Sequence, residues 1–353
     1  MNDSRILYLD IARIVAVGSM VMLHVAAQKW HLLVTSSEWQ ACNVYDSIVR
    51  FCVPLFVMIS GALFLDPDKN VSLKRLYGKN IFRIVTAFVF WSVAYAVLIT
   101  HRSILSEVIS GSGIRSLTGT IVVGHVHLWF LYMIVGLYMV VPFLKKIAAD
   151  KKLTEYFLLL AFVFTFIIPC LHAIPALAGT LEVILEKKLH FHFVLGYSFY
   201  FVGGFYLHRY GLSLWKKYGV YLLGMIGVLL TIFMTNYLSV RVGEGVGWFY
   251  GYLRPHTAMT TIAIFIFFRD NVSRISFGEK TVGHILTVSK YSFGIYLVHM
   301  FFIFYVIHKI DYVVAPHIHP VITIPLYTLI VLICSYIASA VLNRIPVLNR
   351  YIV

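Results

Sequence analysis

The chain has 353 residues, of which 60% are hydrophobic and only 12% are charged, and its formal net charge is +14 at pH 7. This composition excludes a soluble globular protein, because too little polar surface is left to face water. The positive charges are dispersed over several loops and form no continuous basic arm, so they indicate contact with anionic membrane lipids and exclude nucleic acid as a partner. The sequence therefore predicts an all-α polytopic membrane protein.

Ten apolar stretches have the length of a membrane-spanning helix, which needs about 20 residues. They cover residues 6–27, 46–65, 81–100, 122–143, 156–174, 192–208, 218–238, 250–268, 287–308 and 321–342. No soluble appendage, long linker or internal repeat interrupts them, so we expect a single membrane domain over residues 1–353. An even number of spans places both termini on the same side of the membrane.

The Lys and Arg residues are unevenly divided between the two sides of this topology. The loops on the side of the termini carry 19 of them, and the opposite loops carry 8. Because positively charged loops stay in the cytoplasm, we expect both termini to be cytoplasmic. Arg13 then lies nearer the cytoplasmic face of the membrane, and His24 lies nearer the outer face.

The first span carries three ionisable residues, Asp10, Arg13 and His24, in an otherwise apolar run. Such groups cost several kcal/mol in hydrocarbon unless they face a polar interior, so three in one span indicate a site. Eleven residues separate Arg13 from His24, which on an α-helix places them on one face and about 16 Å apart. Asp10 lies one turn before Arg13, where it can pair with the guanidinium. The alternative is structural: Asp10 and Arg13 neutralise each other, and His24 completes a hydrogen bond in the core.

A basic entrance precedes and opens the third span, with Arg75, Lys79 and Arg83 among its residues. On an α-helix Lys79 and Arg83 share a face, because they are four residues apart. Such a patch suits a polyphosphate. The ordinary excess of positive charge in cytoplasmic loops is the alternative explanation.

His127 and Trp129 open the fourth span at its outer end. A histidine and a tryptophan beside a cleft suit the hydroxyl groups and the apolar face of a sugar. The alternative is that these residues only anchor the helix at the membrane interface, as aromatic residues commonly do.

A polar stripe runs along the ninth span, where Ser292, Tyr296 and His299 are spaced four and three residues apart. This spacing places the three side chains on one helix face. They can line a substrate site, or they can form a buried hydrogen-bond network that holds no ligand.

Two further patterns are typical of helix packing. The Ser60–Gly61 pair in the second span favours a close approach between helices, and the alternative is that it lets the helix bend or lets a ligand approach the backbone closely. The four cysteines, Cys42, Cys52, Cys170 and Cys334, show neither metal-binding nor redox spacing, so we expect no metal site.

Four blocks of the sequence together resemble the acyltransferase-3 family of integral-membrane O-acyltransferases. They are LDIARIVAVGSMVMLH at 9–24, VPLFVMISGALFL at 53–65, HLWFLYMIVGLYMVVPFL at 127–144 and SKYSFGIYLVH at 289–299, and they occur in the order of the family. The chain is most similar to the short, stand-alone members, such as the enterobacterial common antigen acetyltransferase and the O-antigen acetylases.

The resemblance implies transfer of an acyl group, usually acetyl, from cytoplasmic acyl-CoA to a hydroxyl of an extracytoplasmic glycan or a lipid-linked sugar. Acetyl-CoA or another acyl-CoA is then a donor substrate, and no bound cofactor is expected. The implied partners are the donor, a cell-surface polysaccharide or its lipid-linked precursor, and membrane lipids; a homo-oligomer is left open. The implied location is the bacterial cytoplasmic (inner) membrane.

The resemblance also assigns roles to residues of the first and third spans. Arg13 would bind or orient the donor, with Asp10 holding it in place. Lys79 and Arg83 match basic positions of the family, with Arg75 nearby, although the family often has a denser arginine cluster where this chain reads KNIFR. His24, Arg13 and Asp10 would form the catalytic set, in which His24 carries the chemistry either as general base or as a carrier of the acyl group.

The remaining candidates belong to the acceptor side. By their position in the family motifs, His127, Trp129, Ser292, Tyr296 and His299 would line the acceptor site or support the residues that do.

Two other functional classes fit the same residues. In a secondary transporter or flippase for a small polar solute, Arg13 would clamp a carboxylate or phosphate and His24 would relay protons. A scaffold for glycan-synthesis proteins would need neither activity. The lack of an internal repeat favours the enzyme over the transporter.

Overall fold

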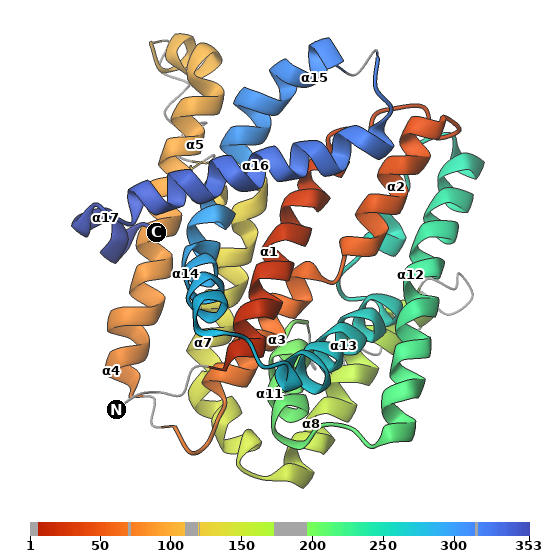
Figure 1. The fold of residues 1–353 in the computed structure, drawn as a ribbon, viewed down its shortest axis with the longest axis vertical. Helices are drawn as coiled ribbons and strands as arrows, with labels where there is room; N and C mark the ends of the chain where they lie inside the picture. Colours follow the sequence, from red (N-terminus) through yellow and green to blue (C-terminus); the bar gives the residue numbers. More distant parts are fainter. Residues whose placement is uncertain (1–5, 70–71, 110–118, 120, 173–195, 315–316) are drawn as a thin grey trace.

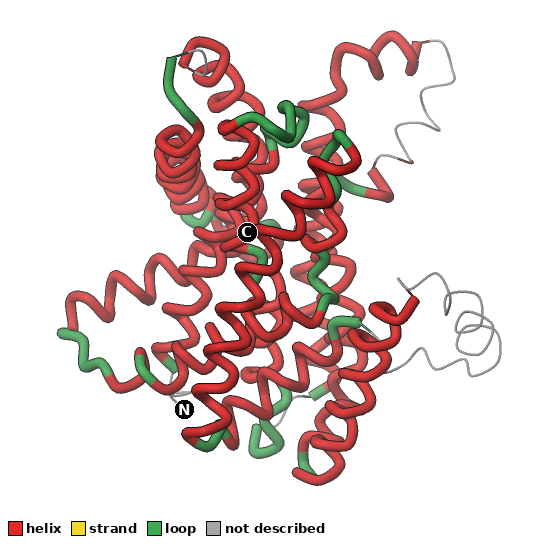
Figure 2. The backbone as a smooth tube through the Cα atoms, turned by 90° about the vertical axis from the view of Figure 1, so that its right-hand side faces the viewer, coloured by secondary structure: helices red, strands yellow, loops and turns green. Residues whose placement is uncertain are grey.

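The computed structural model describes residues 6–69, 72–109, 119, 121–172, 196–314 and 317–353, and within these ranges it contains helices and loops but no strand (Figures 1 and 2). The longer helices are α1 (Leu7–Ala27), α2 (Ser37–Val49), α3 (Cys52–Phe64), α5 (Phe82–Ile109), α7 (Trp129–Ala148), α8 (Lys151–Phe162), α11 (Ser198–Tyr210), α12 (Leu214–Val242), α13 (Pro255–Asp270), α14 (Glu279–Phe302) and α16 (Pro320–Leu342). The short helices are α4 (Leu73–Arg75), α9 (Ile168–His172), α15 (His308–Val314) and α17 (Pro346–Tyr351).

Eight helical segments of the described residues are long and apolar enough to cross a membrane. They are Leu7–Ala27, Ser37–Phe64, Leu73–Leu98, Val126–Ala148, Lys151–Leu171, Leu214–Val242, Glu279–Val313 and Pro320–Leu342. The predicted all-α polytopic membrane fold is therefore confirmed.

The two other expected spans are 192–208, of which residues 192–195 lie outside the described part of the chain, and 250–268. They overlap α11 and α13, which are shorter than a membrane-spanning helix. α11 has 13 residues and α13 has 16. Most side chains of α11 are buried inside the bundle, including Tyr200, Phe201 and Phe205. A short helix that is apolar on all sides suits the core of a helical protein, and sequence hydropathy alone does not separate it from a membrane span.

Several spans depart from regular α-helix. The second span is two helices, because α2 ends at Val49 and α3 begins at Cys52. The third begins with a π-helical segment, Leu76–Ile81, and the segment Ile303–Ile307 after α14 is also π-helical. A π-helical turn shifts the faces that the following residues present, and such turns are frequent at functional sites.

Helix α1 lies in the middle of the bundle, where it packs against α2, α3, α14 and α16 (Figure 1). Its buried positions include Ala12, Ala16 and Val17. The small alanine side chains let neighbouring helices approach closely. The three ionisable residues of this helix are thereby held inside the protein.

Three pairs of helices touch through glycines, and in one of them a Cβ atom added to Gly227 of α12 would lie 2.6 Å from the carbonyl oxygen of His256 in α13. A Cβ atom added to Gly61 of α3 would lie 1.7 Å from the carbonyl oxygen of Phe201 in α11, and one added to Gly204 of α11 would lie 2.1 Å from that of Met58 in α3. A Cβ on Gly294 of α14 would lie 2.1 Å from the hydroxyl of Ser339 in α16. The expected packing role of the Ser60–Gly61 pair is confirmed for Gly61.

Candidate active site

A cavity of about 520 Å³ runs along α1, with walls formed by α1, α3, the start of α5, α7 and α14. Arg13 and His24 both line it. The predicted common face of Arg13 and His24 is therefore present, and the two residues belong to one continuous space. Eleven residues of α-helix separate the two positions by about 16 Å along the axis.

The Arg13 end of the cavity is built on a three-residue network. The Arg13 guanidinium donates hydrogen bonds to the carboxylate of Asp10 and to the hydroxyl of Ser289, both at 3.0 Å. Ser289 in turn donates to the same Asp10 oxygen at 2.5 Å. Asp10 is 4% exposed and does not line the cavity, whereas Arg13 does. Asp10 thus compensates the charge of Arg13 from behind.

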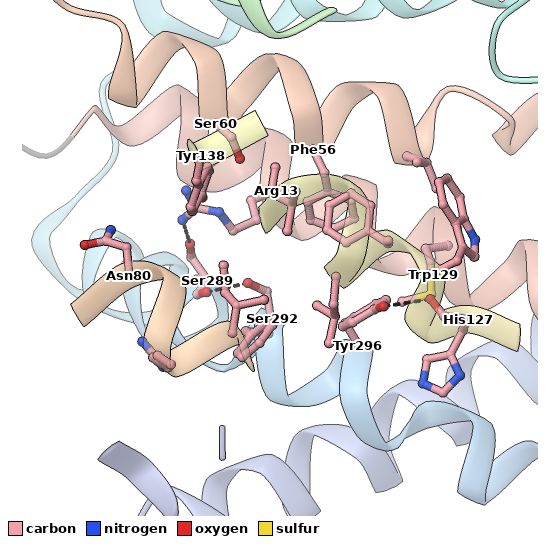
Figure 3. A pocket seen from close by; sticks show the side chains of 18 of the residues that line it. Arg13, Phe56, Ser60, Asn80, His127, Trp129, Tyr138, Ser289, Ser292 and Tyr296 are labelled. Carbon is pink, nitrogen blue, oxygen red and sulfur yellow. Dashed lines mark hydrogen bonds between the residues drawn. The ribbon is translucent and has the colours of Figure 1, made fainter. Parts of the chain in front are cut away.

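Further polar side chains surround this end (Figure 3). Asn80 reaches it from the π-helical segment Leu76–Ile81, Arg83 from the start of α5, and Lys290 from α14. Arg83 also donates a hydrogen bond to the backbone carbonyl of Val353, and its guanidinium lies 5.5 Å from the centre of the Phe293 ring. Arg13, Arg83 and Lys290 make this end cationic, which suits an anionic group such as a phosphate.

Two residues of the predicted basic entrance lie outside the cavity. Arg75 and Lys79 are exposed and do not line it. The expected common face of Lys79 and Arg83 assumes regular α-helix, but Lys79 belongs to the π-helical segment Leu76–Ile81. Asn80 takes the position beside Arg83 instead.

Four histidines gather at the opposite end of the cavity. The ring centroids of His24 and His299 are 5.1 Å apart, and so are those of His299 and His127. His127 continues to His125, with 2.7 Å between their Nδ1 atoms. His24 and His127 line the cavity, whereas His299 is fully buried behind them. The sequence pattern alone does not distinguish a histidine that lines the cavity from one that is buried behind it.

His125 lies directly before the membrane-length segment Val126–Ala148 of the structure, although the expected span 122–143 included it. Its ring stacks on Tyr95 with 4.9 Å between ring centroids. Burial lowers the pKa of His125 below its usual value. Since its Nδ1 faces the Nδ1 of His127, one of the two nitrogens carries a proton and the other accepts it.

Aromatic rings line the histidine end of the cavity. Trp129 stacks on Tyr252 with 5.9 Å between ring centroids and 23° between ring planes. Phe130 packs against Tyr296, and all four residues line the cavity (Figure 3 labels Trp129 and Tyr296). Trp129 keeps 37% of its surface exposed, so its ring can receive the apolar face of a ligand.

The hydroxyls of Ser292 and Tyr296 are engaged with backbone. Ser292 donates to the carbonyl of Ser289, and Tyr296 donates to that of His127, each at 2.7 Å. Both side chains still line the cavity. The polar stripe on α14 therefore includes two cavity residues, Ser292 and Tyr296, and one buried residue, His299.

A buried ion pair outside the predicted set lies where α2 meets α3. Arg50 contacts the Asp46 carboxylate at 2.5 Å, and its guanidinium lies 4.0 Å from the centre of the Tyr250 ring. The i,i+4 spacing of two charged residues in the second apolar stretch was the available signal. Asn80, Ser289 and Lys290 are further cavity residues that the sequence did not single out.

In the part of the chain that the structure describes, no three His, Cys, Asp or Glu side chains are placed to hold a metal ion.

Comparison with known proteins gives one match. A family model described as an acyltransferase domain matches residues 6–340, which is nearly the whole chain. No curated protein and no solved structure matches the chain significantly.

Proposed function

The chain belongs to the acyltransferase-3 family and is a membrane acyltransferase, and on that premise we propose that it transfers an acyl group, in the simplest case acetyl, from cytoplasmic acyl-CoA to a hydroxyl of an extracytoplasmic or lipid-linked glycan. In this proposal both termini are cytoplasmic, and the protein resides in the bacterial inner membrane as one catalytic domain.

The observation that carries the proposal is the single cavity that joins Arg13 to His24. The pantetheine arm of an acyl-CoA is long and thin, and its length is comparable to the axial separation of about 16 Å between the two residues. A nucleotide held at the cationic end can therefore present its thioester at the histidine end. Alignment of the thioester in this way lowers the entropic part of the barrier.

Arg13 and Arg83 are the donor-binding residues in this scheme, with Asn80 and Lys290 beside them. Their positive charge and hydrogen-bond donors suit the phosphates of a nucleotide. Arg75 and Lys79 are exposed outside the cavity. Their part in the scheme is to attract the donor from the cytoplasm, because steering by surface charge needs no direct contact.

His24 acts as the general base. Its unprotonated nitrogen takes the proton of the acceptor hydroxyl while the hydroxyl oxygen attacks the thioester carbonyl. When the tetrahedral intermediate collapses, the carbon–sulfur bond breaks, and the CoA thiolate receives the proton from His24. General-base help of this kind accelerates a reaction by about 10²–10⁴-fold.

In a second route, a nitrogen of His24 itself attacks the thioester, the carbon–sulfur bond breaks, and the CoA thiolate leaves. The glycan hydroxyl then attacks the acyl-histidine, and the carbon–nitrogen bond breaks to restore His24. The two routes differ before the acceptor is added. Purified protein is incubated with acyl-labelled acyl-CoA alone and is then denatured. Label that stays on the wild-type protein and is absent from His24→Gln supports the acyl-His route, and an unlabelled protein supports direct transfer.

The acceptor enters from the aromatic end in this proposal. Trp129 stacks on the apolar face of a sugar ring, and His127, Tyr296 and Ser292 complete the wall around it.

The proposed function is tested with purified protein in liposomes that contain lipid-linked glycan, using acetyl-CoA with a labelled acetyl group. We expect label in the glycan with wild-type protein and a loss of at least about 10²-fold with His24→Gln. His284→Gln is the matched control, because His284 is exposed on α14 and does not line the cavity. Solute uptake without consumption of acetyl-CoA would instead support the transporter.

Mass spectrometry of the surface glycans of the host, with and without the gene, then identifies the acyl group and the acceptor together. An unchanged glycan in cells that lose the protein, or full acetylation with a folded His24→Ala variant, would contradict the proposal and support the scaffold.

A further inference from the structure

His299 is buried behind His24 and has no access to the cavity. Its side chain is 0% exposed, and its ring lies 5.1 Å from the His24 ring between centroids, with 40° between the ring planes. It therefore does not touch a substrate in the cavity, and any effect it has on the reaction must pass through a neighbouring residue.

The hydrogen bond of His299 to backbone decides which of its nitrogens carries the proton. Its Nδ1 lies 2.7 Å from the carbonyl oxygen of Tyr296. A carbonyl oxygen only accepts hydrogen bonds, so Nδ1 carries the proton and donates it. A second proton on the ring would place a full positive charge among three other imidazoles in an apolar core, which is costly. The Nε2 atom is consequently an acceptor with a free lone pair.

That Nε2 atom is buried and has no hydrogen-bond partner among the described residues. An unsatisfied buried acceptor costs about 1–3 kcal/mol, so a donor close to it is stabilising. Two imidazoles are near enough to supply one, His24 and His127, each with 5.1 Å between ring centroids.

The spacing suits an imidazole–imidazole hydrogen bond. In the same cluster His125 and His127 have ring centroids 4.9 Å apart and an Nδ1–Nδ1 distance of 2.7 Å. The His24–His299 separation is 0.2 Å larger, at 5.1 Å. The two centroid separations are nearly equal, so the spacing of the rings is compatible with an N–H group of His24 that donates to Nε2 of His299.

We propose that His299 is a positioning residue for His24: it accepts the N–H of one His24 nitrogen and thereby keeps the lone pair of the other nitrogen directed at the cavity. The inference rests on the proposed function, in which His24 is the base. A neutral imidazole has one proton that can reside on either nitrogen, and only the tautomer with a lone pair toward the substrate can take a proton from the hydroxyl.

A neutral partner also suits the apolar surroundings. While His24 holds the proton of the acceptor hydroxyl, its positive charge strengthens the hydrogen bond to Nε2 of His299. Once the proton passes to the CoA thiolate, the pair is neutral again, and no permanent charge remains buried beside the cavity. A carboxylate in the place of His299 would add such a charge.

Two substitutions test the roles of the two His299 nitrogens independently. In His299→Gln the amide group reaches the position of Nε2 and can still accept the N–H of His24. In His299→Asn the shorter amide reaches only the position of Nδ1 and can still donate to the Tyr296 carbonyl. A purely structural role predicts that the two variants behave alike or that the asparagine is tolerated better.

We expect His299→Asn to lower kcat by about 10- to 100-fold, as loss of an orienting partner does elsewhere, with KM for acyl-CoA unchanged within about twofold. We expect His299→Gln to recover most of the lost kcat. Wild-type kcat in both variants, or an equal loss in both, would overturn the proposal.

A second measurement on the wild-type protein keeps the proposal testable where these variants do not fold. Nitrogen-15 NMR of protein labelled at histidine distinguishes protonated from unprotonated ring nitrogens, and signals missing from His24→Gln identify His24. We expect His299 to be protonated at Nδ1 only and to show coupling across a hydrogen bond to His24. A proton on Nε2 of His299, or coupling to His127 and none to His24, would refute the proposal.

Different results would contradict the proposed function and the proposed role of His299. If wild-type protein transfers no acyl group to any glycan, the proposed function is wrong, while the NMR spectrum still shows whether His24 and His299 are paired. If the protein is active and the pair is absent, only the role of His299 is wrong.

Discussion

The carboxylate of Asp10 lies 3.0 Å from the guanidinium of Arg13 and one helical turn away on the same helix, so the charge at the cationic end of the cavity is compensated from within α1. Asp10 is buried and Arg13 is partly exposed to the cavity. The pair therefore presents the cation to a ligand and keeps the anion away from it.

Asp10→Asn tests this pair. The amide is neutral, so Arg13 loses its counter-charge and its fixed orientation. We expect KM for acyl-CoA to rise by about tenfold and the free energy of unfolding to fall by about 1–3 kcal/mol. Initial rates at varied acyl-CoA concentration measure the KM, and thermal unfolding of the purified protein measures the change in stability. Ser289→Ala removes one neutral partner and should have a smaller effect on both quantities; a larger effect than that of Asp10→Asn would contradict this assignment.

Gly204→Ala tests the contact between α3 and α11. The added methyl group would lie 2.1 Å from the carbonyl oxygen of Met58, so the helices must separate. We expect a loss of stability of at least about 1–3 kcal/mol, because backbone cannot move aside as a flexible side chain can. The yield and thermal unfolding of purified protein measure it. Gly203→Ala is the matched control, since its Cβ would meet only a methyl group of Leu158 at 3.8 Å.

Trp129→Ala tests the aromatic end. Removal of the ring takes away the surface proposed to stack on a sugar, so we expect KM for the glycan acceptor to rise by about tenfold, in line with the 1–3 kcal/mol of a buried aromatic contact. KM for acyl-CoA should stay unchanged. Trp215→Ala provides the comparison, because Trp215 is 90% exposed on α12, away from the cavity. A rise in the KM for acyl-CoA without a rise in the KM for the glycan would show that Trp129 contacts the donor and would contradict its proposed role in acceptor binding.

His125 predicts a pH dependence of stability. Because burial lowers its pKa in the folded protein, the unfolded chain binds more protons between the folded value and the usual value near 6.5. The stability contribution is therefore complete above pH 6.5 and is lost as the pH falls below it. We expect His125→Phe, which keeps a ring against Tyr95, to show a smaller drop in Tm between pH 7.5 and pH 5 than wild type, as about one titrating group is removed. An equal drop in both proteins would exclude His125 as a contributor.

The sequence predicted the helical membrane fold and the central relationship of the site. Apolar length is enough to place the long helices, and the 3.6-residue period is enough to place Arg13 and His24 on one face of α1. Both depend on local geometry alone. The location of Ser292 and Tyr296 on one face of α14 follows for the same reason.

The structure differs from the sequence-based prediction where the outcome depends on irregular helix geometry or on contacts between helices, which the local hydrophobic period does not report. Lys79 leaves the cavity because the chain forms a π-helical segment at Leu76–Ile81, which a regular period does not anticipate. His299 shares a face of α14 with Tyr296, but the His24 ring of α1 packs against it, and His299 is fully buried and does not line the cavity. The short, buried α11 resembles a membrane span because its residues are apolar on every side.

The glycine contacts also restrict how the protein can admit a long donor. At Gly61 and Gly204 the backbones of α3 and α11 touch, and at Gly294 α14 touches α16. The cavity walls α3 and α14 are therefore each held against a neighbouring helix outside the cavity, and neither can move away from that neighbour without breaking the contact. A cross-link between α3 and α11 would join two helices whose backbones already touch, so it should leave turnover nearly unchanged.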